Sequence, residues 1–137
     1  MEYKKLLKYP HLKAEETEIW SRFIEKYPDA FESVDYDILV GKGAEVGAGE
    51  SEEMRKDIEY LTKKKIDVVG YKNNEISVIE IRQRAGLDMV GKVVAYLELY
   101  RAIAPADKAL IGVLITDQKM SDVEELCQKF GIRFFLA

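Results

Sequence analysis

The chain has 137 residues, enough for one domain that buries about two-thirds of its unfolded surface. Its formal net charge of −4 argues against broad, nonspecific coating of nucleic acid, and its single cysteine, Cys127, excludes an internal disulfide. No apolar run reaches the roughly 18 residues of a membrane-spanning helix, and the N-terminus lacks the apolar core of a signal peptide. We therefore predict an intracellular, cytoplasmic protein that does not enter a membrane.

Hydrophobic periodicity predicts secondary structure in the order α-β-α-β-β-α-β-α-β. We expect helices at residues 11–27, 52–61, 86–103 and 121–130, and strands at residues 33–40, 66–71, 75–83, 109–116 and 132–136. A glycine-containing loop is expected at 41–51, and Asn73-Asn74 predicts a tight hairpin turn. The order indicates an α/β fold, a mixed sheet flanked by helices, in a single domain spanning residues 1–137.

Local patterns refine two of the predicted helices. Met54, Ile58 and Leu61 recur on one side of the short second helix and predict an apolar face. Ser121 and Glu124 have the spacing of a capping box at the start of the last helix. That last helix also carries the cysteine at helical spacing from apolar neighbours, so we expect the thiol to be buried rather than nucleophilic.

Two carboxylates lie inside apolar strand patterns thirteen residues apart, Asp67 in K-I-D-V-V-G-Y and Glu80 in V-I-E-I-R. Burying them costs free energy, and unit charges about 4 Å apart repel by roughly 4 kcal/mol at an effective dielectric of 20. A divalent cation, or a basic partner, would remove that cost. Asp67, Glu80 and the Ile81 carbonyl are therefore predicted to hold Mg²⁺ or Mn²⁺, whose oxygen ligands they supply.

The segment 63–101 is the basic part of the chain, with eight basic and five acidic side chains. It contains both strand carboxylates, and we interpret its charge as a local footprint for an anionic ligand. Lys65 and Arg84 are the side chains to which we assign substrate contact. The alternative is that the lysine run at 63–65 is simply solvated surface.

Three other polar residues have simpler interpretations. Asp35 and Asp37 alternate along the first strand, so we expect them to share one strand face that is exposed; the alternative is that they contribute to the acidic site. His11 is the only histidine and follows a proline, so we expect it at the surface. The absence of a histidine and cysteine set excludes an ordinary zinc site.

The pattern D-x(12)-E-x-R, between an upstream helix and a long downstream helix, resembles the motif of the PD-(D/E)XK nuclease superfamily. There an Asp ends one strand and Glu-x-Lys lies on the next. The segments V-D-Y-D-I-L-V-G, L-T-K-K-K-I-D-V-V-G-Y and V-I-E-I-R-Q-R-A-G together resemble a phage-like branch of uncharacterised proteins. The resemblance covers most of the chain. It implies a restriction-endonuclease-like core, a DNA substrate and Mg²⁺ or Mn²⁺, and it suggests a homodimer.

The resemblance also implies roles for individual residues. It places metal ligands at Asp67 and Glu80, with Glu18 or Glu15 of the first helix as an added acidic contact. Arg82 occupies the position of the superfamily's lysine, and arginine stays protonated. Arg82 can hold a phosphate, but its guanidinium can equally pair with either carboxylate and close the site without a metal.

A second departure concerns the downstream helix. RecB-like members carry Gln-x-x-x-Tyr there, whereas this chain has Lys92 and Tyr96, which are four residues apart and therefore on one helix face. We predict that Lys92 is a displaced lysine that points into the site; the alternative is that it snorkels to the surface. Tyr96 either contacts substrate or is a core aromatic residue.

Two functions of different classes follow. The first is a metal-dependent nuclease that hydrolyses DNA phosphodiester bonds, or a protein derived from one, with catalytic Asp67, Glu80, Arg82 and Lys92. The second is a catalytically inactive nuclease-like fold that acts as a DNA-binding or assembly module. A weaker third option is an unrelated α/β domain, which would not bring the two strand carboxylates together.

Overall fold

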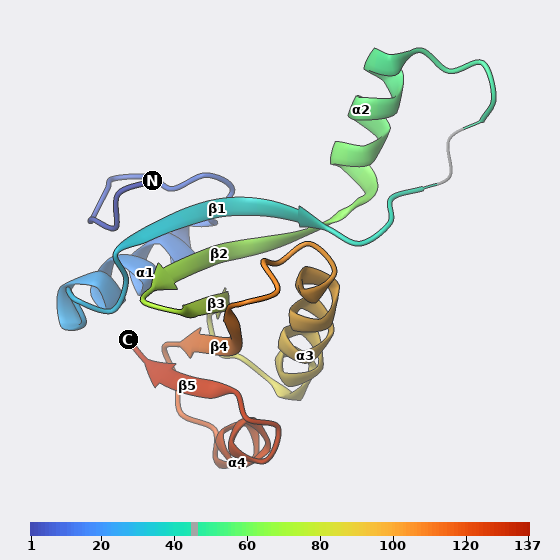
Figure 1. The fold of residues 1–137 in the computed structure, drawn as a ribbon. Helices are drawn as coiled ribbons and strands as arrows, with labels where there is room; N and C mark the ends of the chain where they lie inside the picture. Colours follow the sequence, from blue (N-terminus) through green and yellow to red (C-terminus); the bar gives the residue numbers. More distant parts are fainter. Residues whose placement is uncertain (45–46) are drawn as a thin grey trace.

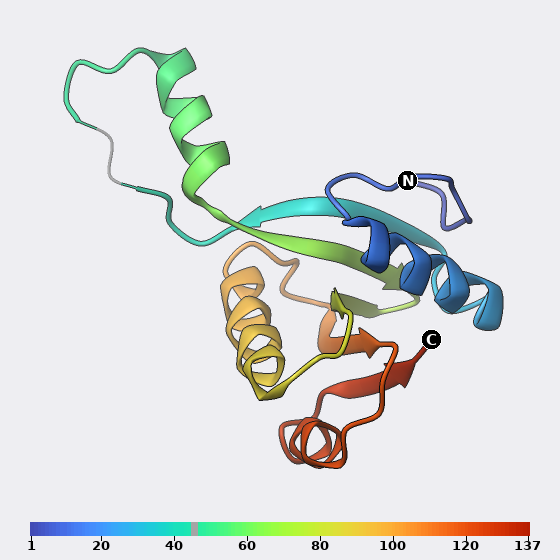
Figure 2. The same cartoon turned by 180° about the vertical axis from the view of Figure 1, so that it is seen from behind.

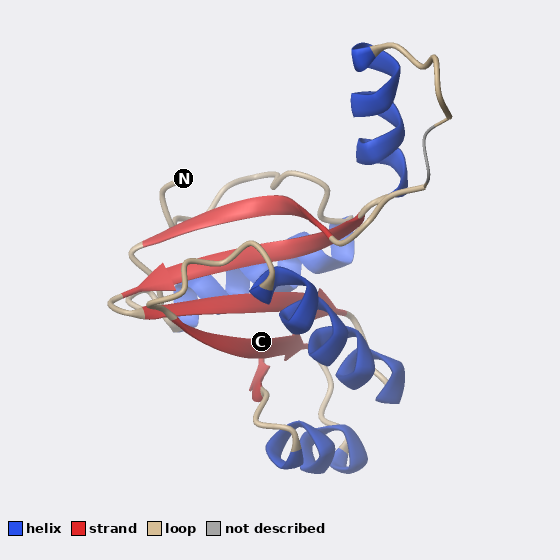
Figure 3. Ribbon diagram, turned by 45° about the vertical axis from the view of Figure 1, so that its right-hand side comes forward, coloured by secondary structure: helices blue, strands red, loops and turns tan. Residues whose placement is uncertain are grey.

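The computed structural model describes residues 1–44 and 47–137. Five strands form one mixed sheet in the spatial order β1-β2-β3-β4-β5, and helices cover both of its faces (Figures 1 and 3). The strands are β1 (Ser33–Val40), β2 (Lys64–Lys72), β3 (Glu75–Arg82), β4 (Ala109–Thr116) and β5 (Arg133–Leu136). The helices are α1 (Ala14–Lys26), α2 (Glu52–Thr62), α3 (Leu87–Arg101) and α4 (Ser121–Lys129). The predicted element order and the mixed, helix-flanked sheet are confirmed.

The sheet is antiparallel at one side and parallel at the other. β1, β2 and β3 pair antiparallel, while β3, β4 and β5 pair parallel. Asn73 adopts a φ of +54° in the β2–β3 turn, as expected for a tight hairpin, and Gly131 adopts +71° after α4. The parallel strands are joined through α3 and α4, which pack together on one face of the sheet.

Helix α1 covers the opposite face and supplies its core. Its stripe Ile19, Trp20, Phe23 and Ile24 is buried against apolar residues of β1 to β4. Trp20 is fully buried, and its indole N–H donates a hydrogen bond of 3.0 Å to the hydroxyl of Tyr36. Each such buried apolar side chain contributes about 1.5–3 kcal/mol, so this stripe anchors α1 to the sheet.

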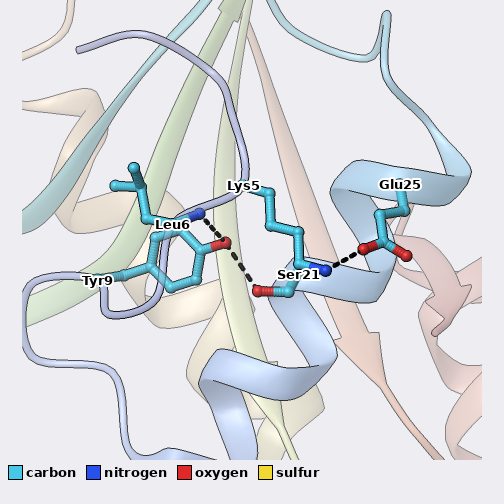
Figure 4. Close-up of polar contacts among 5 residues, drawn as sticks. All are labelled: Lys5, Leu6, Tyr9, Ser21 and Glu25. Carbon is cyan, nitrogen blue, oxygen red and sulfur yellow. Dashed lines mark hydrogen bonds and ion pairs between the residues drawn. The ribbon is translucent and has the colours of Figure 1, made fainter.

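The chain before α1 is held against that helix by polar contacts (Figure 4). The Tyr9 hydroxyl accepts a hydrogen bond of 3.0 Å from the Leu6 N–H and shares one of 2.8 Å with the Ser21 hydroxyl. Lys5 forms an ion pair with Glu25. These contacts explain how a segment without regular secondary structure takes a defined path.

Helix α2 projects away from the sheet at the end of the β1–β2 ribbon (Figures 1 and 2). None of its residues is buried, and the Met54 and Leu61 side chains are 50% and 75% exposed. The helix itself was predicted, and the Ser51 hydroxyl caps it by accepting a hydrogen bond of 3.1 Å from the Met54 N–H. Its apolar side therefore faces solvent instead of joining the core.

Two expectations are wrong, and a third falls partly outside the described residues. Helix α1 begins at Ala14 rather than at residue 11, because His11 has a φ of +59°, which a right-handed helix does not allow. The predicted capping box is wrong: Ser121 is the first helical residue of α4 and Met120 precedes it without a side-chain cap. The predicted loop at 41–51 includes positions 45 and 46, which lie outside the described residues.

None of the helices in the described part of the chain is long and apolar enough to cross a membrane.

Two glycines provide a matched test of packing. A Cβ added to Gly70 in β2 would lie 2.5 Å from the Phe31 ring, whereas one added to Gly91 in α3 would meet nothing within 4 Å. We expect Gly70→Ala to destabilise the protein by about 1–3 kcal/mol through overpacking. Gly91→Ala should stabilise it by roughly 0.5–1 kcal/mol because the helix interior loses a flexible residue. Urea unfolding measures both changes, and equal midpoints for the two variants would contradict the packing shown here.

Candidate active site

Two strand carboxylates meet at one end of the β2–β3 hairpin. The last paired row is Val68 with Ile79, and the next row along the same register contains Asp67 and Glu80. Asp67 is fixed there because its Oδ2 accepts a hydrogen bond of 3.0 Å from the Ile81 N–H. A side chain thus replaces the backbone acceptor that a continued ladder would supply, and it brings the two carboxylates side by side.

Glu80 is the unusual member of this pair. Its side chain is completely buried, and among the described residues neither carboxyl oxygen has a hydrogen-bond partner. Buried polar atoms nearly always have such a partner, so an unpartnered carboxyl needs an explanation. Burial first, and then the neighbouring Asp67 carboxylate, raise the pKa of Glu80 far above its ordinary value, while Lys92 opposes this shift. Without an added cation, this environment therefore favours the protonated form of Glu80.

Lys92 points into this site from α3. Its Nζ lies 3.9 Å from Glu80 Oε1, an ion-pair distance but too long for a hydrogen bond. The same ammonium lies 5.2 Å from the centre of the Tyr96 ring, which allows a cation–π interaction. Desolvation raises the pKa of Tyr96, and Lys92 opposes the shift, so the phenol stays protonated. The structure thus shows Lys92 turned toward the carboxylates rather than only toward solvent.

Arg82 does not converge with these groups. Its Nη1 lies 3.2 Å from the Met89 sulfur, and its Nη2 lies 4.0 Å from Asp88 Oδ2 at the start of α3. The side chain is 49% exposed, so it stands at the surface beside the site. Within the described part of the chain, its ion pair is with Asp88 and not with Asp67 or Glu80. The structure therefore lacks the guanidinium–carboxylate pair that would close the site without a metal.

The acidic residues of α1 lie elsewhere. Glu18 is exposed and lines a shallow hollow with Lys5 and Leu6 on the outer side of the helix. Glu15 lines a hollow of about 150 Å³ together with Arg82. In the described residues, no three His, Cys, Asp or Glu side chains are grouped to hold an ion. Glu18 is therefore not placed as a third carboxylate, and further ligands would have to come from the backbone or from solvent.

The two residues assigned to substrate contact lie outside the carboxylate pair. Lys65 is the second residue of β2, and its Nζ lies 4.8 Å from the centre of the Tyr60 ring. Arg84 lies in the exposed loop after β3 with a φ of +49°, where its N–H donates to Asp117 Oδ1 at 2.8 Å. Both are near the ends of the strands that carry the pair, and the structure leaves their roles as predictions.

A polar cluster beside the site was not foreseen from the sequence. His11 Nε2 lies 3.0 Å from Asp37 Oδ2 and 2.6 Å from the Tyr60 hydroxyl, so the N-terminal segment, β1 and α2 meet here. Asp37 has a φ of +56°, and it does not share a regular strand face with Asp35, which instead accepts a hydrogen bond from Tyr71. Spacing alone carries no signal for such a left-handed residue.

The left-handed residue changes the direction of β1. Before it, Val34 and Tyr36 belong to the core beneath α1, and after it, Val40 belongs to the core beneath α3. In a regular strand these three residues would share one face. The break therefore rotates the β1–β2 ribbon at the level of the carboxylate pair, where α2 leaves the body of the protein.

Comparisons with known proteins support the fold. No family model matches the sequence, and no curated protein sequence matches it significantly. A crystal structure of a repair endonuclease from Pyrococcus abyssi is similar, with 17% identity and a TM-score of 0.52, over 96% of this chain and 49% of that one. A protein of unknown function is similar with 16% identity and a TM-score of 0.53, over 83% of this chain and 52% of that one.

This chain thus spans about half the length of both solved structures. At such low identity the likeness shows the fold alone. The chain has an α/β restriction-endonuclease-like fold, and that prediction is confirmed.

The state of Glu80 predicts how stability depends on pH. Since its pKa is raised above the unfolded value near 4.5, the folded protein binds the extra proton, and stability is lost as pH rises from there toward the folded pKa. With a chelator present, wild-type protein should therefore be less stable at pH 8 than at pH 5. Glu80→Gln should lose most of this slope and exceed wild type in stability at pH 8. Denaturant unfolding at several pH values measures this.

An exposed carboxylate serves as the control. Glu53→Gln on α2 changes the same chemical group at the surface and should keep the wild-type pH slope. Parallel pH profiles for Glu80→Gln and wild type would contradict the prediction. They would mean that burial of the Glu80 carboxyl does not change how the free energy of unfolding depends on pH.

Proposed function

We propose that this chain is a metal-dependent nuclease of the PD-(D/E)XK type that hydrolyses DNA phosphodiester bonds, with residues 1–137 forming one such domain. The observation that carries the proposal is the fully buried Glu80 carboxyl, which has no hydrogen bond to any described residue and lies beside Asp67 and 3.9 Å from Lys92. An arrangement so costly to stability is typical of functional sites, where perturbed pKa values concentrate. The fold shared with a repair endonuclease supports DNA as the substrate.

The residues present suit a hard divalent cation. The oxygens of Glu80 have no partner among the described residues, Asp67 adds a second carboxylate, and Ile81, the next residue of β3, would add its carbonyl. An all-oxygen set of this kind favours Mg²⁺ or Mn²⁺ over softer metals. When bound, such an ion would supply Lewis-acid stabilisation of the charge that develops on the phosphate. Its charge would also keep Glu80 ionised.

Basic side chains would bind the phosphate groups of the DNA. Lys92 replaces the missing motif lysine from a different element, and its ammonium is positioned to hold a phosphate oxygen at the carboxylate pair. Tyr96 supports Lys92 through its ring. Arg82 stands exposed at the margin, where together with Arg84 and Lys65 it would contact the DNA backbone. In a homodimer, two such sites would reach the two strands of a duplex.

A metal titration tests the ligand set without requiring activity. Millimolar Mg²⁺ or Mn²⁺ should raise the melting temperature of the wild type by about 3–10 °C, because a ligand at 100 times its dissociation constant adds about 2.7 kcal/mol. Asp67→Asn and Glu80→Gln should abolish this shift, and Glu53→Gln should retain it. Differential scanning fluorimetry in chelated buffer gives the baseline. A shift that persists in both site variants would exclude the proposed ligands.

A cleavage assay separates the two basic candidates. Linear, circular, branched and single-stranded DNA should be tested with Mg²⁺ and Mn²⁺, with Asp67→Ala as the inactive control. We expect Lys92→Met to lower the cleavage rate about 100-fold or more, because it removes a charge at the reacting phosphate. Arg82→Lys should stay within a few-fold of wild type. Lys129→Met, on exposed α4 surface, is the matched lysine control. Loss of activity in Arg82→Lys with activity kept in Lys92→Met would reverse the assignment.

A second function is favoured by a specific departure from the motif. Arg82 cannot act as a base, and the whole chain is acidic. A catalytically inactive nuclease-like fold that binds DNA or takes part in assembly fits these two facts. It predicts no cleavage of any substrate and no thermal shift with divalent metal, so the two experiments above distinguish the alternatives.

A further inference from the structure

A cavity opens on the α1 face of the sheet, away from the carboxylate pair. Its volume is about 500 Å³, within the range of small-molecule sites. Ser77 lines it, near the start of β3, whereas Glu80 lies near the end of the same strand. These two residues are three apart and so point to opposite faces, which separates the cavity from the metal-type site.

Small residues in the strands create this cavity. Gly70 and Ser77 are direct neighbours across the β2–β3 pair. The Phe31 ring lies over Gly70, at a position that any larger residue would occupy. Ser77, Phe31 and Phe135 all line the cavity. The result is a recess with aromatic walls and a serine in its floor.

Ser77 adds a polar group to the lining of the cavity. The residue is 5% exposed and lines the cavity. A ligand with a polar edge can therefore hydrogen-bond to the serine hydroxyl, whereas a purely hydrocarbon ligand cannot.

Two lysines stand at the rim of the cavity with little compensation. Lys26 donates to the carbonyl of Leu136 at 3.4 Å, and Lys72 donates to the carbonyl of Asp29. Both partners are neutral carbonyl oxygens, so the two ammonium charges remain available for an anion.

An arginine completes the rim. Arg133 lies 3.4 Å from the Glu75 carboxylate. The Asp29 and Glu75 carboxylates also line the cavity, so three cations face two anions and the rim is positive overall. An anionic group of the ligand therefore belongs at the two lysines rather than at the arginine.

We propose that this cavity binds a nucleobase joined to a phosphate, either as a free mononucleotide or as the terminal nucleotide of a DNA strand. The aromatic walls of Phe31 and Phe135 stack on the base, as aromatic side chains do in single-strand binding. The Ser77 hydroxyl bonds to a polar edge of the base. Lys26 and Lys72 hold the phosphate. The site does not involve Asp67 or Glu80, and so it stands whether or not the chain cleaves DNA.

Calorimetry with three probes tests the chemical class. The probes are deoxyadenosine monophosphate, deoxyadenosine and inorganic phosphate, each titrated into the full chain in chelated buffer. We expect saturable binding of the nucleotide, binding about tenfold weaker for the uncharged nucleoside, and no measurable binding of phosphate alone. Nucleotide and nucleoside binding equally well, or phosphate binding as well as the nucleotide, would overturn the proposal.

Variants place the binding in the cavity. Ser77→Leu fills the floor and should lower nucleotide affinity at least tenfold while the thermal shift with divalent metal is unchanged. Lys72→Gln, at the partly exposed rim, should weaken binding of the nucleotide but not of the nucleoside. This variant tests whether the ligand binds in the cavity even if Ser77→Leu fails to fold. Arg55→Gln removes an exposed cation from α2, a helix that contributes no residue to the cavity lining, and this variant should bind the nucleotide as wild type does. Unchanged nucleotide binding in Lys72→Gln would contradict the site.

A competition experiment distinguishes the two sources of the ligand. A short 5′-phosphorylated single strand that displaces deoxyadenosine monophosphate identifies a strand end as a ligand. Failure of that strand to compete identifies the free nucleotide. A circular single strand that competes as well as the nucleotide would indicate an extended DNA groove and would overturn the proposal of a nucleotide pocket.

Discussion

The buried carboxyl of Glu80 is the constraint around which the site is arranged. It belongs to β3, the middle strand of the sheet, so neighbouring strands and α3 together exclude water from it. Two charged groups lie next to it: Asp67, held in place by a backbone N–H, and Lys92, which extends toward it from α3. Neither of them satisfies it with a hydrogen bond. A carboxyl kept in this state costs stability, and that cost is explained where a cation completes the site.

The same strand serves both faces of the sheet. Alternation along β3 directs Glu80 toward α3 and Ser77 toward α1, so one element carries two buried polar residues in two different environments. On the α3 face the surroundings are charged and suit a metal and a phosphate. On the α1 face they are aromatic with a basic rim and suit a nucleotide. The central position of β3 explains why both groups are buried.

Much of the fold could be predicted because it depends on local periodicity. The strand at Ser33–Val40 and the paired strands around the Asn73 turn follow from alternation and turn chemistry. The features that could not be predicted depend on conformations and neighbours that spacing does not encode. The left-handed Asp37 reverses the faces of β1, and the apolar residues of α2 find no partner in the described structure although their spacing is regular.

The candidate site divides in the same way. The sequence alone determined that Asp67 and Glu80 lie on successive strands and that Lys92 and Tyr96 share a helix face, because these relations are set by the strand and helix repeats. Only the tertiary structure decided which cation approaches the carboxylates. Arg82 is two residues from Glu80, yet it extends to Asp88, while Lys92 is twelve residues away and lies within 3.9 Å. The packing of α3 against β3 places Lys92 rather than Arg82 near Glu80, and no local sequence pattern predicts this packing.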